Sequence, residues 1–213
     1  FKNHFLLHPF HLNYEDKEPV INQKAFKKYL REYLENQHIS IEKLYGYNFK
    51  DTKGKDIPYI LIKRPINGPL RLLFEKEPDN NLVIGHSFSK IGELTPEKKF
   101  ILIIGIVSGI DFIHKKSKAF ACLNPDTVYL NQKYRPKICC GSFIEPQNID
   151  DDDKEEISEL KLLTDVSFAA PEVLSEKHVY QNSDMFSIGM MIYYIINGIE
   201  PFQKQSVETK IKN

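Results

Sequence analysis

The sequence predicts an α+β fold in which strands dominate the first third of the chain and long helices dominate the rest. Short aromatic and aliphatic runs bounded by polar turns occur before residue 65. A helix-capping signal precedes a long apolar stretch near residue 95, and a second apolar stretch ends at a glycine at position 198. Strands and helices therefore separate along the chain instead of alternating regularly.

The first part of the chain is expected to hold three or four strands and one helix. Residues 4–14 are typical of one or two strands. Residues 44–49 and 59–62 are typical of two further strands, joined by a turn at residues 51–55. Residues 22–36 predict a helix, because their apolar residues fall on one stripe: Phe26, Tyr29, Leu30, Tyr33 and Leu34.

The second part should hold two long helices. Thr95 followed by Pro96 predicts a helix start, with threonine as the cap and proline in the first turn. This helix runs to about Lys115 and is apolar on most sides, so we expect it to be buried. The other helix begins at Ser183 or Asp184 and is closed by Gly198.

Two smaller features lie between these helices. Residues 127–130 and 136–139 predict short strands around a polar turn. Residues 150–156 are strongly acidic and predict a solvated loop. That loop could instead dock a basic partner, or stay open through self-repulsion as a substitute for phosphate.

Charge and composition argue against some classes of partner. Lysine plus arginine and aspartate plus glutamate both number 29 among 213 residues, so the formal net charge is zero. This balance gives no reason to expect nucleic acid or an anionic membrane as a partner. The longest apolar run, residues 101–107, is too short to cross a bilayer, and no secretory signal opens the chain. We therefore expect a cytoplasmic protein.

The cysteines and the first residue add two expectations. The three cysteines include an adjacent pair, Cys139 and Cys140, and do not form a disulfide framework. A reducing compartment follows as the default. Because the chain begins with Phe1 and not with methionine, we expect it to be a segment of a longer protein.

Five sequence blocks occur in a fixed order in the second half. They are Ile106-Val107-Ser108-Gly109-Ile110-Asp111-Phe112-Ile113-His114, Leu123-Asn124-Pro125-Asp126-Thr127-Val128-Tyr129-Leu130, Arg135-Pro136-Lys137-Ile138, Ala170-Pro171-Glu172, and Asp184-Met185-Phe186-Ser187-Ile188-Gly189 with Asn197-Gly198-Ile199-Glu200-Pro201-Phe202. In this order and spacing they resemble a protein kinase domain. They match the helix before the catalytic loop, that loop, the strand before the magnesium-binding motif, the end of the activation segment and the central helix.

The first half resembles the smaller kinase lobe. Residues 38–47 are similar to the fourth strand, and Tyr59-Ile60-Leu61-Ile62 to the hinge strand of tyrosine-kinase-like serine/threonine kinases. The resemblance implies a two-lobed protein-kinase-like fold. Residues 1–65 would form a partial, reduced N-terminal β lobe that ends in the hinge. Residues 66–213 would form a mainly helical C-terminal lobe, truncated after the central helix and lacking its final helices.

The resemblance also shows which catalytic groups differ. Phosphoryl transfer in kinases uses a catalytic aspartate, a phosphate-binding lysine, and an aspartate and an asparagine on the metal ions. In the catalytic loop, Cys122 stands at the position of the catalytic base, Asn124 at the position of a further lysine of that loop, and Thr127 at the position of the metal-binding asparagine. Cys140 stands at the position of the metal-binding aspartate, and Asn13 at the position of the phosphate-binding lysine. A thiol is a poor magnesium ligand, so the resemblance implies no metal site.

The adenine pocket is altered as well. Ile62 matches the gatekeeper, and the third residue after it, Pro65, has no N–H to donate to adenine. Tyr129 matches the small residue on the pocket floor, where its ring could fill the space. We therefore expect binding of ATP and magnesium to be absent or weak, with no cofactor.

Positions with structural roles in kinases are kept. The aspartate of the central helix is expected to hydrogen-bond the catalytic-loop backbone, and the apolar ring at position 120 is expected in the core. These structural positions are Phe120, Ala170, Pro171, Glu172, Asp184 and Gly189. The resemblance implies that the arginine that pairs with the glutamate at position 172 in kinases is expected beyond residue 213.

The sequence is compatible with two functions. The first is a catalytically inactive pseudokinase that acts in signalling as a protein-interaction scaffold or allosteric regulator. Its partner would be an active kinase or other domains of the same longer chain. The alternative is a weakly active or nucleotide-binding serine/threonine kinase domain, in which Asp126 or Glu145 replaces the lost acids. A disulfide or soft-metal site between Cys122 and Cys140 is conceivable, but buried free thiols are favoured.

Overall fold

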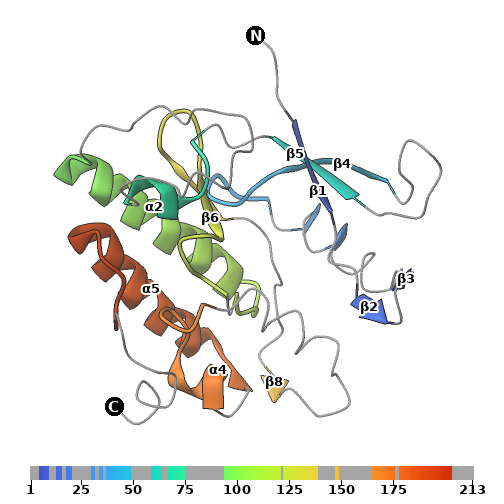
Figure 1. Cartoon of the computed structure of the whole chain (residues 1–213). Coiled ribbons are helices and arrows are strands. Elements are labelled where there is room, and N and C mark those ends of the chain that lie inside the picture. The colour runs from blue at the N-terminus through green and yellow to red at the C-terminus, as the bar shows by residue number, and fades with distance from the viewer. Residues whose placement is uncertain are drawn as a thin grey trace.

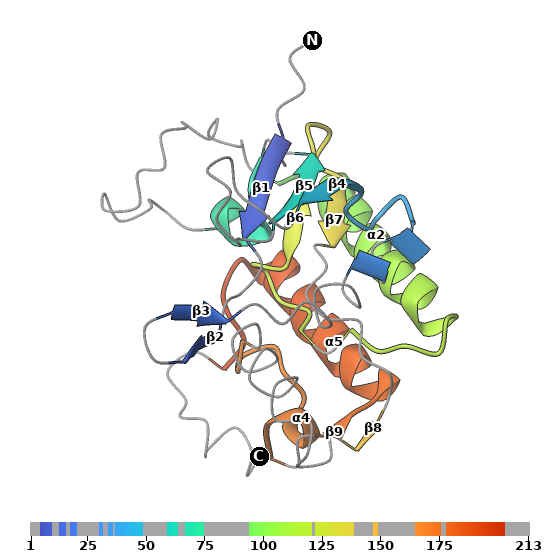
Figure 2. The same cartoon turned by 90° about the vertical axis from the view of Figure 1, so that its right-hand side faces the viewer.

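The computed structural model describes residues 5–9, 13–15, 18–20, 30–31, 34–35, 37–48, 59–63, 67–74, 94–120, 122–138, 147–148, 165–175 and 178–202. Within these residues the fold is α+β, as predicted. Figures 1 and 2 show a small sheet at one end of the molecule and two long helices, α2 and α5, side by side at the other.

The small sheet has three antiparallel strands in the order β1-β5-β4. Strand β1 (Phe5–Pro9) and strand β4 (Leu44–Asn48) flank β5 (Tyr59–Lys63), and the β4–β5 register shifts between Leu44 and Gly46. The central strand is a nearly continuous apolar run, which suits a strand with neighbours on both sides. The predicted strand positions are confirmed.

Two further elements lie in the first part of the chain. Strands β2 (Asn13–Glu15) and β3 (Glu18–Val20) pair antiparallel as a short hairpin. Of the helix predicted over residues 22–36, the described residues 30–31 and 34–35 are helical. Leu30 is buried in the core.

Helix α2 (Pro96–His114) begins where the sequence predicts. The Thr95 hydroxyl accepts a hydrogen bond from the N–H of Lys98 at 3.4 Å, and proline occupies the first turn. Two glycines allow α2 to pack closely on β7 (Pro136–Ile138). A Cβ on Gly105 would lie 2.4 Å from Pro136, and one on Gly109 would lie 2.6 Å from Ile138, so the contact requires both glycines.

The prediction that α2 is buried was wrong for one face. Leu102, Ile106, Ile110 and Ile113 are buried. A second stripe is exposed, and its members are Phe100, Ile101, Ile104 and Val107. A helix that is apolar on most sides shows too little periodicity for the buried side to be told from the sequence. None of the described helices is long and apolar enough to span a membrane.

The middle of the chain joins the two helices. The 3-10 helix η1 (Leu70–Leu73) precedes α2, and β6 (Val128–Leu130) pairs antiparallel with β7 after it. Ile41 forms a parallel bridge with Ile138. This bridge connects the chain before β4 to the strand pair.

The last elements surround the second long helix. Helix α4 (Pro171–Ser175) is followed by β9 (His178–Val179), which pairs with β8 (Gln147–Asn148). Helix α5 (Gln181–Asn197) ends at Gly198, which has a φ of 72° as its predicted role as a helix terminator requires. A large core joins α2, α5, η1 and the β6–β7 pair, and Leu70, Leu102, Phe120, Phe168 and Met191 are almost fully buried in it.

Candidate functional site

The loop between α2 and β6, residues 119–127, is fixed to α5 at its start. Phe120 is fully buried, and its backbone N–H donates to Asp184 Oδ2 at 2.7 Å. The same carboxylate oxygen lies 2.8 Å from His114 Nε2 at the end of α2. One buried carboxylate therefore connects the loop, the end of α2 and the start of α5.

The next part of the loop binds its own backbone. The Cys122 thiol is 2% exposed and donates to the carbonyl of Phe120 at 3.3 Å. Asn124 donates through its side-chain nitrogen to the Cys122 carbonyl at 3.2 Å, and its oxygen accepts from the N–H groups of Asp126 and Thr127 at 2.8 and 3.1 Å. The Asn124 side chain thus closes the turn from Cys122 to Thr127.

The Thr127 hydroxyl completes this arrangement. It accepts the N–H of Asn124 at 3.0 Å and lies 2.9 Å from the Cys122 carbonyl and 3.0 Å from the Asn124 carbonyl. We call Cys122, Asn124 and Thr127 the loop network. All three residues are buried and uncharged, and the hydrogen bonds that link them to one another span at most five positions in the sequence.

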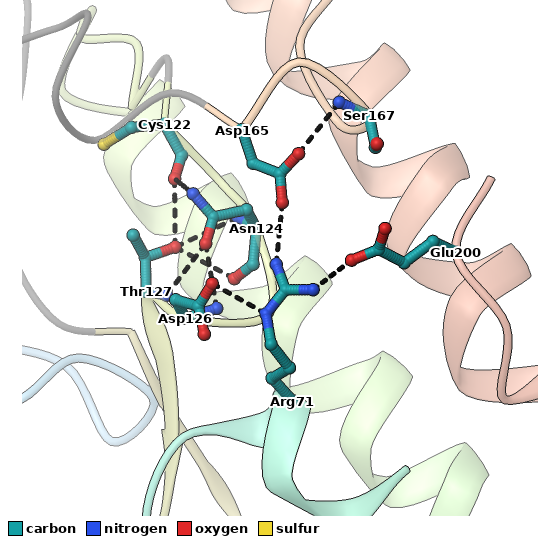
Figure 3. A network of polar contacts seen from close by, with 8 residues as sticks. All are labelled: Arg71, Cys122, Asn124, Asp126, Thr127, Asp165, Ser167 and Glu200. Carbon is teal, nitrogen blue, oxygen red and sulfur yellow. Dashed lines mark hydrogen bonds and ion pairs between the residues drawn. The ribbon is translucent and has the colours of Figure 1, made fainter. Parts of the chain in front are cut away.

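A second, charged network lies beside the first. Arg71 of η1 donates through Nε to Asp126 at 2.8 Å, through Nη2 to Asp165 at 2.7 Å, and through Nη1 to Glu200. Figure 3 shows the three carboxylates around one guanidinium, with the Cys122 sulfur pointing away from them. We call Arg71, Asp126, Asp165 and Glu200 the Arg71 network.

The Arg71 network contains the acidic residue of the loop. The Asp126 side chain is 53% exposed, whereas that of Arg71 is 19% exposed. Asp165 also accepts the N–H of Ser167 through its other oxygen at 2.9 Å, which orders the chain ahead of Ala170. The guanidinium therefore brings together the loop, the chain before α4 and the chain after α5.

Several predicted site residues are only partly described. Asn13 lies on β2 and Ile62 on β5, where the backbone alone is described. Tyr129 is half-buried at the centre of β6, paired with Lys137 and bridged to Pro69. The predictions for Pro65 and Cys140 concern residues outside those that the structure describes, as do the predictions for Cys139, Glu145 and residues 150–156.

The predicted structural residues occupy distinct places around α4 and α5. Ala170 is buried, and its carbonyl accepts the N–H of Val173 at 3.1 Å in α4. Pro171 is the first residue of α4, and the carboxylate of Glu172 accepts the Ser183 hydroxyl at 2.6 Å. Gly189 lies on the exposed side of α5, where an added Cβ would meet nothing within 4 Å.

The described residues of this site do not fit a magnesium ion. Magnesium favours carboxylate and phosphate oxygens in octahedral geometry. The Thr127 hydroxyl and the Cys122 thiol bind the loop backbone instead. Among the described residues no group of three or more His, Cys, Asp or Glu side chains is arranged to hold a metal ion. The predicted lack of a cofactor stays a prediction.

Three members of the Arg71 network were not predicted as site residues. Arg71 and Asp165 lie in no sequence block, and Glu200 was quoted only in the block after the central helix. Their pairing is not visible locally, because Arg71 is 94 positions from Asp165 and 129 from Glu200. Asp126 was named only as a substitute acid. A turn signal at Asn67-Gly68-Pro69 marks the start of η1 but says nothing of the partners of the arginine.

Comparison with known proteins identifies the class. The family model of the protein kinase domain matches residues 72–213, which is more than half of the chain. The chain therefore belongs to the protein kinase domain family. This agrees with the sequence blocks, whereas the tyrosine-kinase-like style remains a prediction.

Individual relatives sharpen this assignment. The chain is 26% identical over 196 residues to 3-phosphoinositide-dependent protein kinase 1 of Rattus norvegicus, covering 83% of this chain and 32% of that protein. It is 26% identical over 199 residues to the putative 3-phosphoinositide-dependent protein kinase 2 of Homo sapiens, covering 83% and 45%. It is 24% identical over 129 residues to the probable serine/threonine-protein kinase PBL20 of Arabidopsis thaliana, covering 60% and 32%. The chain thus spans about a third to under half the length of these relatives.

These comparisons overturn one expectation. The substitutions at Cys122, Thr127 and Cys140 led to the prediction that the chain is not an enzyme, and this prediction is wrong. The family model is that of the protein kinase domain, and the relatives are named as protein kinases, which points to an enzyme. The physical reason is that these substitutions remove individual groups, whereas phosphoryl transfer depends mostly on positioning and electrostatic stabilisation by the domain as a whole.

Proposed function

We propose that this chain is part of a serine/threonine protein kinase domain that transfers phosphate slowly to a protein hydroxyl. Kinase catalysis depends mostly on positioning and electrostatic stabilisation, so loss of the catalytic base slows the reaction without abolishing it. We further propose the two-lobed kinase arrangement, with residues 1–65 and 66–213 as the lobes and weak nucleotide binding between them.

The observation that supports this proposal is the bond between Asp184 and the Phe120 N–H. It fixes the start of the loop to the central helix at 2.7 Å, while the loop network holds the turn that follows. The conformation of this loop is therefore preorganised by contacts within the chain. Asp126 is the exposed carboxylate on the same turn, and it is held by Arg71.

The test is phosphate transfer to a serine- and threonine-containing protein substrate, followed by mass spectrometry. We expect slow transfer by the wild type and a rate at least about a hundredfold higher for Cys122→Asp, because a positioned general base contributes about 10²–10⁴-fold. Cys122→Ala is the matched control, and it should keep the wild-type rate. Circular dichroism establishes that each variant is folded.

A clear negative result is available. If folded wild type and folded Cys122→Asp both transfer no phosphate above the rate without protein, the proposed kinase function is wrong. Faster transfer by the wild type than by Cys122→Asp would also contradict the assignment of position 122 as the base position.

A second role is favoured by the loop network. Because Asn124 and Thr127 satisfy the loop backbone without a ligand, the loop can keep one conformation while the domain binds another protein. We therefore propose that the domain also regulates or scaffolds a cytoplasmic signalling partner, either another kinase or another part of the same protein. Variants in the exposed α2 stripe, such as Ile104→Lys, should then impair signalling in cells without changing the rate of phosphate transfer.

A further inference from the structure

Arg71 joins three segments that are far apart in the sequence. Its partners Asp126, Asp165 and Glu200 are 55, 94 and 129 positions away. Asp126 belongs to the catalytic loop, Asp165 precedes Ala170-Pro171-Glu172 at the end of the activation segment, and Glu200 follows α5. Figure 3 shows each carboxylate coming from a different part of the ribbon.

The geometry of the contact requires a guanidinium. Three different nitrogens of Arg71 each donate to a different carboxylate. A lysine ammonium is a compact point charge and lacks the planar fork that reaches three directions at once. The residue type at position 71 is therefore matched to its three partners.

The charges in this network are unbalanced. One positive group faces three carboxylates, and the side chains of Arg71 and Asp165 are only 19% and 24% exposed. Burial lowers the pKa of the guanidinium, but its hydrogen bonds with Asp126, Glu200 and Asp165 more than offset this, so the pKa is raised and the charge is kept. Without the arginine, three like charges would face one another.

Apolar packing beneath the network holds the same segments near one another. The ring centroid of Tyr194 on α5 lies 4.8 Å from the ring centroid of Phe74, which follows η1. It lies 5.7 Å from the ring centroid of Phe168, which comes three residues after Asp165. These contacts do not depend on charge. The aromatic packing thus brings η1, α5 and the chain before α4 together. The ion pairs of Arg71 then determine how these segments are placed relative to one another.

We propose that Arg71 is a positioning residue that sets the end of the activation segment against the catalytic loop. It acts through charge, and the surface it orders is the one a protein substrate would meet if the proposed kinase function holds. The inference rests on that function for its consequence, but the ordering itself can be measured separately.

The test is hydrogen exchange of the full chain followed by mass spectrometry. Arg71→Met should raise exchange at least about tenfold at two separate places, Asp126 and residues 165–169, because charged hydrogen bonds are lost in both. Exchange in β6 and β7 should stay within twofold of the wild type. Arg135→Met is the matched control, since Arg135 is an exposed arginine whose backbone N–H, and not its side chain, bonds Asn131.

A charge-based role makes a prediction that a packing role does not. Adding Glu200→Gln to Arg71→Met should reduce exchange in residues 165–169 toward the wild type, because it removes part of the repulsion left behind. Arg71→Lys should give intermediate exchange. In the phosphate-transfer assay, Arg71→Met should raise the KM for the protein substrate and leave the KM for the nucleotide unchanged.

The outcomes separate this inference from the proposed function. Unchanged exchange at either place in Arg71→Met, or no recovery on adding Glu200→Gln, would overturn the positioning role whatever the enzyme activity. If exchange changes as expected while the wild type transfers no phosphate, the positioning role stands and the kinase proposal falls.

Discussion

The loop network and the Arg71 network lie side by side but are held by different physics. The loop network is buried, uncharged and built from residues at most five positions apart. The Arg71 network is charged and partly exposed, and its carboxylates lie 55 to 129 positions from Arg71 in the sequence. Asp126 links the two networks, because its N–H bonds Asn124 and its carboxylate bonds Arg71. The site therefore combines a locally determined turn with a contact that exists only in the folded chain.

The largest effect is expected from breaking the loop network. Thr127→Val keeps the shape but removes the hydroxyl, leaving the Asn124 N–H and the Cys122 carbonyl without this partner in a buried place. Losing two buried hydrogen bonds of this kind costs about 1–3 kcal/mol in total. Urea unfolding should show this loss, and the loss should be the same at low and high salt.

Thr127→Ser is the control for this change. It keeps the hydroxyl and loses one methyl group, so its free energy of unfolding should fall by about 1 kcal/mol or less. If Thr127→Val were as stable as Thr127→Ser, the hydroxyl bonds would not be holding the loop.

A smaller effect is expected from the Arg71 network. Asp165→Asn removes one carboxylate from Arg71 but keeps an oxygen that can accept the Ser167 N–H. The free energy of unfolding should fall by about 1 kcal/mol, and the loss should shrink near 1 M salt, where the Debye length falls to about 3 Å. Urea unfolding at two salt concentrations measures both.

The matched control is Asp111→Asn on α2. Asp111 pairs with Lys115 four residues away, and both side chains are mostly exposed, at 56% and 73%. Such surface pairs contribute about 0.3–0.5 kcal/mol. If Asp165→Asn and Asp111→Asn lowered the free energy of unfolding equally, the Arg71 network would be no stronger than an ordinary surface ion pair.

The smallest effect is expected at His38, outside both networks. The pKa of His38 is lowered from 6.5, mainly by burial and to a smaller extent by the nearby positive charge of Lys137. The negative charge of Asp111 raises this pKa but does not offset the other two effects. The ring of His38 stacks on Phe112, and its Nδ1 accepts the N–H of Ser40 at 3.2 Å, both of which suit neutral histidine. Between the folded pKa and 6.5 the unfolded chain therefore binds more protons than the folded chain. The contribution of His38 to stability is fully present above pH 6.5 and is lost as the pH falls from 6.5 through the folded pKa.

The measurement is urea unfolding between about pH 7.5 and pH 5.5 for wild type and His38→Asn. Asparagine can still accept the Ser40 N–H but does not titrate. The wild type should lose more stability than the variant on acidification. A larger loss in the variant would mean that the sign of the His38 contribution is reversed.

Most element positions could be predicted because their signals are local. Thr95 with Pro96 marked the start of α2, and Gly198 marked the end of α5. The start of α5 was placed two to three residues too late, at Ser183 or Asp184, because both residues are favoured as helix caps. In the structure Tyr180 is the cap, and the Ser183 hydroxyl reaches back to its N–H at 3.3 Å.

The site was predictable only in part. Spacing located Cys122, Asn124 and Thr127 on one loop and Asp184 on the helix below it, but not the bonds that Asn124 and Thr127 make to the loop backbone. The side of α2 that faces solvent could not be read, because apolar residues occupy both faces. The partners of Arg71 depend on the whole fold, and no local pattern indicates them.

The most direct test of this contrast is hydrogen exchange in the wild type as salt rises from about 0.1 M to 1 M, where screening shortens from about 10 Å to 3 Å. We predict that exchange in residues 165–169 increases several-fold, because their placement depends on the charge of Arg71, whereas exchange in residues 122–124 and at Thr127 stays nearly constant. Equal responses in both segments, or none in residues 165–169, would contradict the division of the site into a neutral local network and a charged long-range one.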